Sequence, residues 1–188
     1  MAVLPIRITG EPVLHTIAGP VVDFDAQLRT LVDDMFETME AAPGVGLAAP
    51  QVGIGLRLFV YNWVDDDEVL WRGVAINPEL WLAPIPAGEA DEDEESEGCL
   101  SIPGERWALR RAPKVMLRAT DIDKKVFEIE ASGWLARIFQ HEYDHLDGTL
   151  YSDRLDHAQS KAVTKVIRKS GWGVPGQSWM PGEDDLEG

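Results

Sequence analysis

The 188-residue sequence predicts a single α+β domain. Three stretches have the pattern of helices, and four others have the alternating or β-branched pattern of strands. No internal repeat divides the chain, and 45% of its residues are hydrophobic, as is typical of globular proteins. We assign residues 1–170 to one domain and residues 171–188, which are rich in Gly, Pro and acidic residues, to a C-terminal extension.

The first predicted helix begins near Asp25 and ends before Pro43 and Gly44. Its apolar residues follow helical spacing and are Leu28, Leu31, Val32, Met35, Phe36 and Met39. We interpret this face as core packing rather than as a methionine-rich metal site. Residues 44–53 (GVGLAAPQVG) follow as a loop of small residues, in which Gln51 alone offers a ligand both a donor and an acceptor.

The predicted strands span residues 57–61, 73–77, 114–120 and 125–131. Residues 121–124 (DIDK) are predicted to join the last two strands as a hairpin. A second helix is predicted over residues 134–147, with Ser132 as its N-cap and Gly148 after its end. This helix has one narrow polar stripe and is otherwise mostly apolar, so we predict that it is buried. The stripe consists of Arg137, Gln140, Asp144 and Asp147.

A His-Glu-x-x-His motif lies in this second helix. His141 and His145 are four residues apart, so they share a face and could hold one metal ion. Glu142 would lie beside that ion, where it could reach a bound water. Buried histidines and a buried glutamate are costly without partners, and a metal would supply one. The alternative is a pair of satisfied core histidines with a glutamate that reaches the surface.

Cys99 is the better candidate for a third ligand. A lone cysteine is often a small buried hydrophobe, but a thiolate would complete a tetrahedral site with one open position. One class of metalloproteases continues the motif to a third histidine, where this chain has Tyr151. Another class takes a glutamate from a later helix, and no later helix here obviously provides one.

The formal net charge is −16, and three runs hold fifteen of the acidic residues: 65–68, 89–97 and 183–187. We interpret each run as a solvated loop or end, and we predict no DNA binding. No run of eighteen apolar residues could span a membrane, and the N-terminus shows no export signal. The single cysteine cannot form an internal disulfide. Together these observations favour the cytoplasm.

A last helix is predicted over residues 153–170, with basic residues at spacings of three or four. They are Arg154, His157, Lys161, Lys165 and Arg168. The simplest interpretation is a solvated face opposite apolar Leu155, Ala162, Val166 and Ile167.

Three stretches together resemble the peptide deformylase family: residues 44–51 (GVGLAAPQ), 97–101 (EGCLS) and 140–148 (QHEYDHLDG). They occur in the family's order and at similar spacing, within a resemblance that runs from about residue 6 to residue 169. The resemblance implies antiparallel or mixed β-sheets wrapped around a central metal-binding helix, with N-terminal and C-terminal helices. It also implies a bacterial, cytoplasmic enzyme that removes the formyl group from the N-terminal formyl-methionine of nascent polypeptides and releases formate.

The resemblance further implies a role for individual residues. The metal ligands would be Cys99, His141 and His145, holding Fe²⁺, with Zn²⁺, Ni²⁺ or Co²⁺ in its place in purified protein. Glu142 would be the acid–base residue, and the Gln51 side chain and the Leu100 backbone N–H would stabilise the oxyanion. The peptide would bind as an extended strand, with its methionine in an apolar pocket. These substrate contacts would come from Val45, Gly46, Glu97, Gly98, Trp134, Ile138 and the His141 ring.

Two arginines and the last helix complete these expectations. Arg137 occupies a position where the family often has an aliphatic pocket residue, and Arg106 aligns with an arginine near the peptide path. The basic stripe of the last helix would contact the ribosome. Two other functions stay open from the sequence. A zincin-type metallopeptidase would not need Cys99, and a non-catalytic metal-stabilised binding module would keep its function after Glu142→Ala.

Overall fold

The computed structural model describes residues 2–184 and residue 186. Its helices are α1 (Ala26–Ala41), α2 (Gly133–Leu146) and α3 (His157–Lys169), with 3-10 turns η1 (Pro12–His15), η2 (Ala49–Val52) and η3 (Tyr151–Arg154). The strands are β1 (Ile6–Arg7), β2 (Gly46–Ala48), β3 (Leu58–Val64), β4 (Leu70–Leu82) and β5 (Ser96–Cys99). They continue with β6 (Ile102–Ala108), β7 (Lys114–Thr120), β8 (Val126–Ser132) and β9 (Ser178–Trp179).

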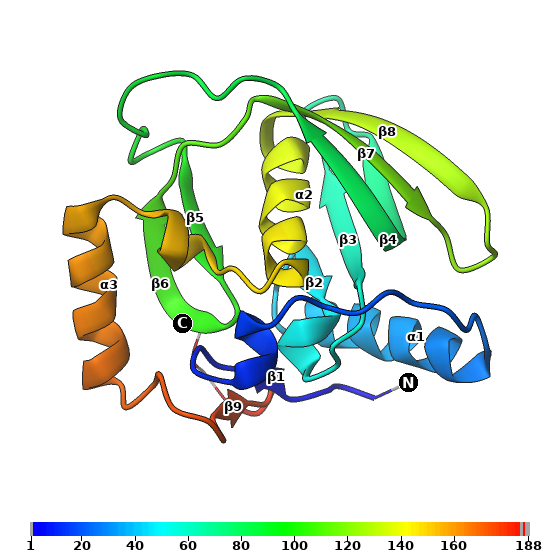
Figure 1. The fold of residues 1–188 in the computed structure, drawn as a ribbon, viewed down its shortest axis with the longest axis horizontal. Helices are drawn as coiled ribbons and strands as arrows, with labels where there is room; N and C mark the ends of the chain where they lie inside the picture. Colours follow the sequence, from blue (N-terminus) through cyan, green and yellow to red (C-terminus); the bar gives the residue numbers. More distant parts are fainter. Residues whose placement is uncertain (1, 185, 187–188) are drawn as a thin grey trace.

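The main sheet has five antiparallel strands in the order β2-β3-β4-β7-β8. Two small antiparallel pairs, β5-β6 and β1-β9, lie outside it. Helix α2 stands at the centre, with the main sheet on one side and the β5-β6 hairpin on the other (Figure 1). Helix α3 lies beyond that hairpin and α1 lies below the sheet. The predicted α+β fold around the histidine-bearing helix is therefore confirmed.

Helix α2 is buried because apolar side chains cover most of its circumference. Leu135, Ile138 and Phe139 are each at most 4% exposed and pack against the inner face of the main sheet. The Phe139 and Tyr61 rings meet edge to face, with centroids 5.0 Å apart. Most of the polar stripe is also buried, since only Asp147 of its four residues is exposed. Its buried members therefore need partners inside the protein.

The predicted strands are present, and residues 114–120 match β7 at both ends. The hairpin at residues 121–124 is confirmed, with the Asp121 N–H bonded to the Lys125 carbonyl at 2.9 Å. Strand β4 is longer than predicted, because it passes through Pro78 rather than ending there. A bulge between Ile76 and Glu79 accommodates the proline, which has no N–H to donate.

The ends of α2 agree with the sequence in one respect and differ in another. Gly148 adopts a φ of +69°, as expected for the residue after a helix end, and a Cβ there would lie 2.8 Å from the Thr16 nitrogen. Ser132 occupies the N-cap position, but its side chain makes no capping hydrogen bond. The predicted N-cap residue is therefore confirmed, but it caps the helix without a side-chain hydrogen bond.

The last predicted helix is shorter than residues 153–170. Leu155 is extended and separates η3 from α3, and Asp156 caps α3 by accepting from the N–H groups of Ala158 and Gln159. Arg154 is therefore not part of the basic face of α3, which consists of His157, Lys161, Lys165 and Arg168. The buried contact of α3 is Val163, which the predicted apolar face omitted.

The acidic run at residues 89–97 is not simply a solvated loop. Glu97 is 3% exposed and lies in β5, and Glu95 pairs with Arg110 at 2.8 Å. That prediction was therefore wrong for the C-terminal part of this run. In the last acidic run, Asp185 and Glu187 lie outside the described residues. Among the described residues, no helix is long and apolar enough to cross a membrane.

Candidate active site

Three candidate metal ligands meet beside α2. His141 and His145 lie one turn apart on the helix, and their ring centroids are 5.0 Å apart. Cys99 comes from the end of β5, and its Sγ is 3.3 Å from the Nε2 of His145. One possible ligand atom from each residue lies within 4.8 Å of the others. The fold thus brings the cysteine to two histidines that follow it by more than forty positions in the sequence.

The chemistry of this donor set fits a divalent transition metal. A thiolate and two imidazoles are the ligands of catalytic zinc-type sites with one open position. The Nδ1 of His141 contacts Glu97 Oε1 at 3.2 Å, which leaves its Nε2 for an ion. Glu142 Oε2 is buried and has no hydrogen-bond partner among the described residues. A buried carboxylate oxygen without a protein partner is expected to interact with a molecule bound in the site.

Glu97 anchors His141 through a buried network of charges. Its carboxylate accepts from Arg111 at 2.6 Å and from Arg137 at 3.0 Å, as well as contacting His141. Arg111 also donates to Asp144 at 2.6 Å, so it links β5 to α2. Each of these residues is buried or nearly so. The network fixes the orientation of the His141 ring.

The charges around the site separate the pKa values of its groups. Burial raises the pKa of Glu97, but the hydrogen bond with His141 and the charge of Arg111 lower it by more. Burial raises the pKa of Glu142 to about 7. Burial lowers the pKa of His141, but the Cys99 sulfur and Glu97 outweigh it and leave that pKa well above its usual value. Burial and the nearby His141 lower the pKa of His145. Glu142 is therefore suited to exchange a proton near neutral pH.

Gly46 allows β2 to pass directly against Glu142. A Cβ at this position would lie 2.4 Å from Glu142 Oε1, which is closer than van der Waals contact allows. The small-residue loop predicted from the sequence is therefore a short strand, β2, followed by η2. Its glycine permits the close approach expected of such residues.

Gln51 has a fixed orientation in η2. Its Oε1 accepts the Ala48 backbone N–H at 2.8 Å, so its Nε2 faces the site. That nitrogen lies 3.9 Å from Cys99 Sγ and 3.5 Å from Ser101 Oγ. Gln51 is 1% exposed, so its amide is held in a dry environment. A donor in such a place is well suited to stabilise developing negative charge.

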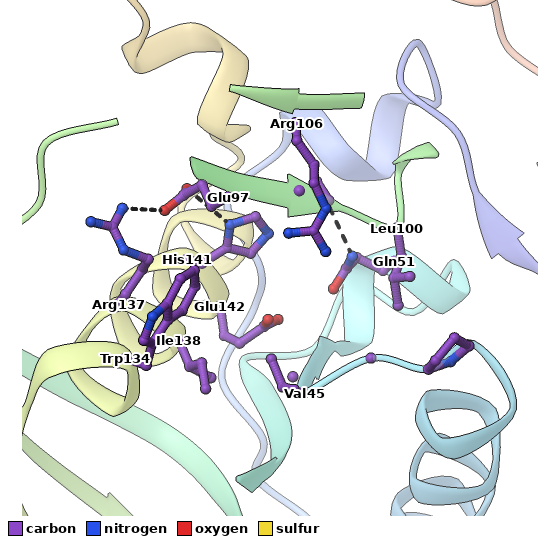
Figure 2. A pocket seen from close by; sticks show the side chains of 15 residues that line it. Val45, Gln51, Glu97, Leu100, Arg106, Trp134, Arg137, Ile138, His141 and Glu142 are labelled. Atoms are coloured by element: carbon purple, nitrogen blue, oxygen red, sulfur yellow. Dashed lines mark hydrogen bonds and ion pairs between the residues drawn. The ribbon is translucent and has the colours of Figure 1, made fainter. Parts of the chain in front are cut away.

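A cavity of about 150 Å³ opens beside these groups. It is lined by all the site residues that the sequence analysis predicted, except His145. The lining includes Val45, Gly46, Gln51, Glu97, Gly98, Cys99, Leu100, Arg106, Trp134, Arg137, Ile138, His141 and Glu142. Figure 2 shows the Glu142 carboxylate pointing into this space, with Trp134 and Ile138 along α2 at one side.

The two arginines at the cavity differ in their surroundings. Arg137 is 8% exposed and donates to Glu97 and to the Leu109 carbonyl, so its charge is turned away from the open space. Arg106 is exposed on β6 and forms no ion pair within the part of the chain that the structure describes. Its guanidinium extends over the cavity (Figure 2).

Sequence reasoning missed three parts of the site. Arg111 was not singled out, although it joins Glu97 to Asp144. The Glu97 side chain, expected only near the peptide path, contacts His141. Tyr151 was considered only because it occupies the position of a third histidine in one class of metalloproteases. Its ring stacks on the His141 ring, with centroids 6.1 Å apart. Arg111 lies in the connection between β6 and β7, where no periodic pattern marks it.

Comparisons with known proteins identify the family of this chain. The family model described as polypeptide deformylase matches residues 3–161. The peptide deformylase of Tropheryma whipplei strain Twist is 50% identical over 192 residues, covering 96% of this chain and 83% of the relative. That of Rhodococcus opacus strain B4 is 49% identical over 186 residues, covering 97% of this chain and 95% of the relative.

Solved structures give the same result. The crystal structure of a peptide deformylase from Legionella pneumophila superposes with a TM-score of 0.77 at 40% identity, covering 90% of this chain and 96% of that one. The peptide deformylase from Thermus thermophilus gives a TM-score of 0.74 at 40% identity, covering 89% of this chain and 94% of that one. The chain belongs to the polypeptide deformylase family.

Proposed function

We propose that this enzyme removes the formyl group from the N-terminal formyl-methionine of nascent polypeptides and releases formate. The observation that carries the proposal is the meeting of Cys99, His141 and His145 beside Glu142, whose buried Oε2 has no hydrogen-bond partner among the described residues. The family membership supports the same reaction. Since bacterial nascent chains emerge in the cytoplasm, we infer that the enzyme acts there.

Each residue of the site has a role in this reaction. Cys99, His141 and His145 would hold a divalent cation, which supplies Lewis acidity when bound. Glu142 takes a proton from the attacking water and later delivers it to the leaving amine. Gln51 Nε2 and the Leu100 backbone N–H donate to the oxygen that gains negative charge. The orientation of Gln51 supports its part, because Ala48 already occupies its Oε1.

The peptide would bind between two free strand edges. Strand β2 is the last strand in its sheet, and among the described residues β5 pairs with β6 alone. Gly46 of β2, Val45 just before it, and Glu97 and Gly98 of β5 line the cavity. An extended peptide could add to both edges through its main chain, which tolerates many sequences. Trp134 and Ile138, with Val45 and the His141 ring, would enclose the methionine side chain, and Arg106 would lie along the peptide path.

We infer that Fe²⁺ is the physiological cation and that Zn²⁺, Ni²⁺ or Co²⁺ can replace it. A set of one sulfur and two imidazole nitrogens suits each of these ions. Metal analysis of protein purified without oxygen tests the inference. We expect iron in about one equivalent. Iron-free protein that is fully active with another native metal would contradict it.

Formate release distinguishes this activity from peptidase activity. We expect the metal-loaded enzyme to release formate from formyl-Met-Ala-Ser and to leave the peptide bonds intact. Acetyl-Met-Ala-Ser provides the matched substrate, since it differs only at the acyl group. Cleavage of internal peptide bonds without formate would favour a zincin-type metallopeptidase. Metal binding without any hydrolysis would favour a binding module.

We propose that the basic face of α3 contacts the ribosome. His157, Lys161, Lys165 and Arg168 are exposed on this helix and surround a shallow surface pocket. Changing Lys161, Lys165 and Arg168 to glutamate is expected to abolish co-sedimentation with ribosomes, because phosphate contacts dominate such binding. Formate release from a short peptide should be unchanged.

A second triple variant controls for the change in net charge. Lys114, Arg118 and Lys125 are exposed on the β7-β8 hairpin, away from α3. Changing these three residues to glutamate alters the net charge equally and is expected to spare co-sedimentation. Equal binding by both triple variants would remove the basic face of α3 from ribosome recognition.

A further inference from the structure

The segment after α3 returns to the body of the protein. The Gly173 N–H donates to the Thr9 carbonyl at 2.9 Å, and Ser178–Trp179 pairs with Ile6–Arg7 as β9 and β1. Trp179 is 3% exposed and packs in the core cluster with Ile6. Figure 1 shows β9 beside β1, below the turn between β5 and β6. The proposed function gives this segment no role.

Trp179 contacts the turn that carries Cys99 and Leu100. Its indole Nε1–H donates to the Leu100 carbonyl oxygen at 2.9 Å. This N–H is the only polar group of the tryptophan side chain. The bond therefore joins the C-terminal segment directly to the backbone between β5 and β6.

The same peptide group contacts the cysteine sulfur at its other end. The Ser101 N–H, which shares a peptide with the Leu100 carbonyl, donates to Cys99 Sγ at 3.4 Å. A donor at the oxygen of a peptide strengthens its N–H as a donor, and the effect is larger in a buried environment. Ser101 is fully buried and Cys99 is 5% exposed. Trp179, the peptide and the sulfur thus form one chain of hydrogen bonds.

The next peptide of the turn is also held. The Thr9 N–H donates to the Ser101 carbonyl at 2.8 Å, and Thr9 follows the strand that pairs with β9. The carbonyls of Leu100 and Ser101, which follow Cys99, therefore both accept hydrogen bonds from residues in or next to β1 and β9. These two bonds act together with the pairing of Cys99 with Ile102, which closes the turn, to fix the Leu100 backbone.

We propose that Trp179 is a positioning residue for the active site, acting through the Leu100–Ser101 peptide. By holding the Leu100 carbonyl, Trp179 restricts the Leu100 backbone and so orients the Leu100 N–H on the other side of the same residue. It also strengthens the hydrogen bond that Cys99 Sγ receives from Ser101. This inference rests on the proposed function, in which Leu100 donates to the oxyanion and Cys99 holds the cation. It gives residues 171–179 a role in the reaction itself.

Trp179→Phe removes the indole N–H and keeps an aromatic ring in the core. We expect kcat for formyl-Met-Ala-Ser to fall about tenfold, the factor that matches one buried hydrogen bond, with KM changed less than twofold. Addition of Co²⁺ to the metal-free protein gives a second readout. The thiolate-to-cobalt absorption band should move to longer wavelength, because a sulfur that receives a weaker hydrogen bond holds its electrons less tightly.

Trp172→Phe is the matched control in the same segment. Trp172 is partly buried against the core, and its ring nitrogen has no hydrogen bond within the described residues. We expect its kcat and cobalt band to equal those of the parent. Equal behaviour of Trp179→Phe and Trp172→Phe in both readouts would overturn the proposal.

A second change at the same position separates the hydrogen bond from packing. 3-Benzothienylalanine at position 179 replaces the ring N–H by sulfur and keeps the two-ring shape. It is expected to reproduce the lower kcat and the shifted band, and parental values would overturn the proposal. A parent protein that binds Co²⁺ through Cys99 but releases no formate would instead contradict the proposed function. The band comparison would still test Trp179.

Discussion

Replacing Glu142 with glutamine is expected to slow formate release by about 10²- to 10⁴-fold, the range that positioned acid–base groups contribute. Glutamine has nearly the same shape, so it fits beside Gly46, where the space is too narrow for a Cβ. Its amide cannot accept the proton of the attacking water. The measurement is formate production from formyl-Met-Ala-Ser by parent and variant loaded with the same metal.

Metal content must be measured in both proteins, because loss of the cation would slow the reaction for a different reason. Glu128→Gln is the matched control, since Glu128 is exposed on β8 and does not line the cavity. We expect it to retain the parental rate. Full metal content together with a parental rate in Glu142→Gln would remove Glu142 from the mechanism.

Replacing Arg111 with methionine is expected to destabilise the metal-free protein by about 3–5 kcal/mol, the usual cost of breaking a buried ion pair. Arg111 is 7% exposed and lies 2.6 Å from both Glu97 and Asp144. Methionine fills part of the space but leaves two buried carboxylates with one cation fewer. For a domain of this size, the melting temperature should fall by roughly 10 °C.

Thermal unfolding in EDTA measures this effect without a contribution from bound metal. Arg118→Met is the control, because Arg118 pairs with Glu128 at 3.8 Å on the surface and both side chains are more than half exposed. We expect its melting temperature to match that of the parent. Arg137 also donates to Glu97, and Arg154 donates to Asp144 at 2.7 Å. A parental melting temperature in Arg111→Met would show that these remaining contacts suffice.

Local patterns were enough to predict much of the fold. The β7-β8 hairpin followed from alternation and a turn, and α1 followed from its apolar spacing, because both depend on neighbouring residues. The β5-β6 hairpin was missed, since Gly98, Pro103 and Gly104 interrupt its alternation. The pairing of β9 with β1 joins the two ends of the chain, and two-residue strands carry no periodic signal.

The candidate site was predictable where chemistry is concentrated in a motif. His141, Glu142 and His145 are close in sequence, and the spacing of the two histidines alone indicates a shared helix face. The arrangement around them depends on tertiary contacts. Arg111 donates to Asp144 across 33 positions, and Trp179 donates to Leu100 across 79. Neither contact has a sequence pattern, so the supporting network required the structure.

X-ray absorption spectroscopy of the zinc-loaded enzyme tests most directly whether Cys99, His141 and His145 hold the cation together. We expect one sulfur at about 2.3 Å and two nitrogens at about 2.0–2.1 Å, with one further light atom. The sulfur should disappear in Cys99→Ser. A parental metal shell made only of nitrogen and oxygen would contradict the account of the site.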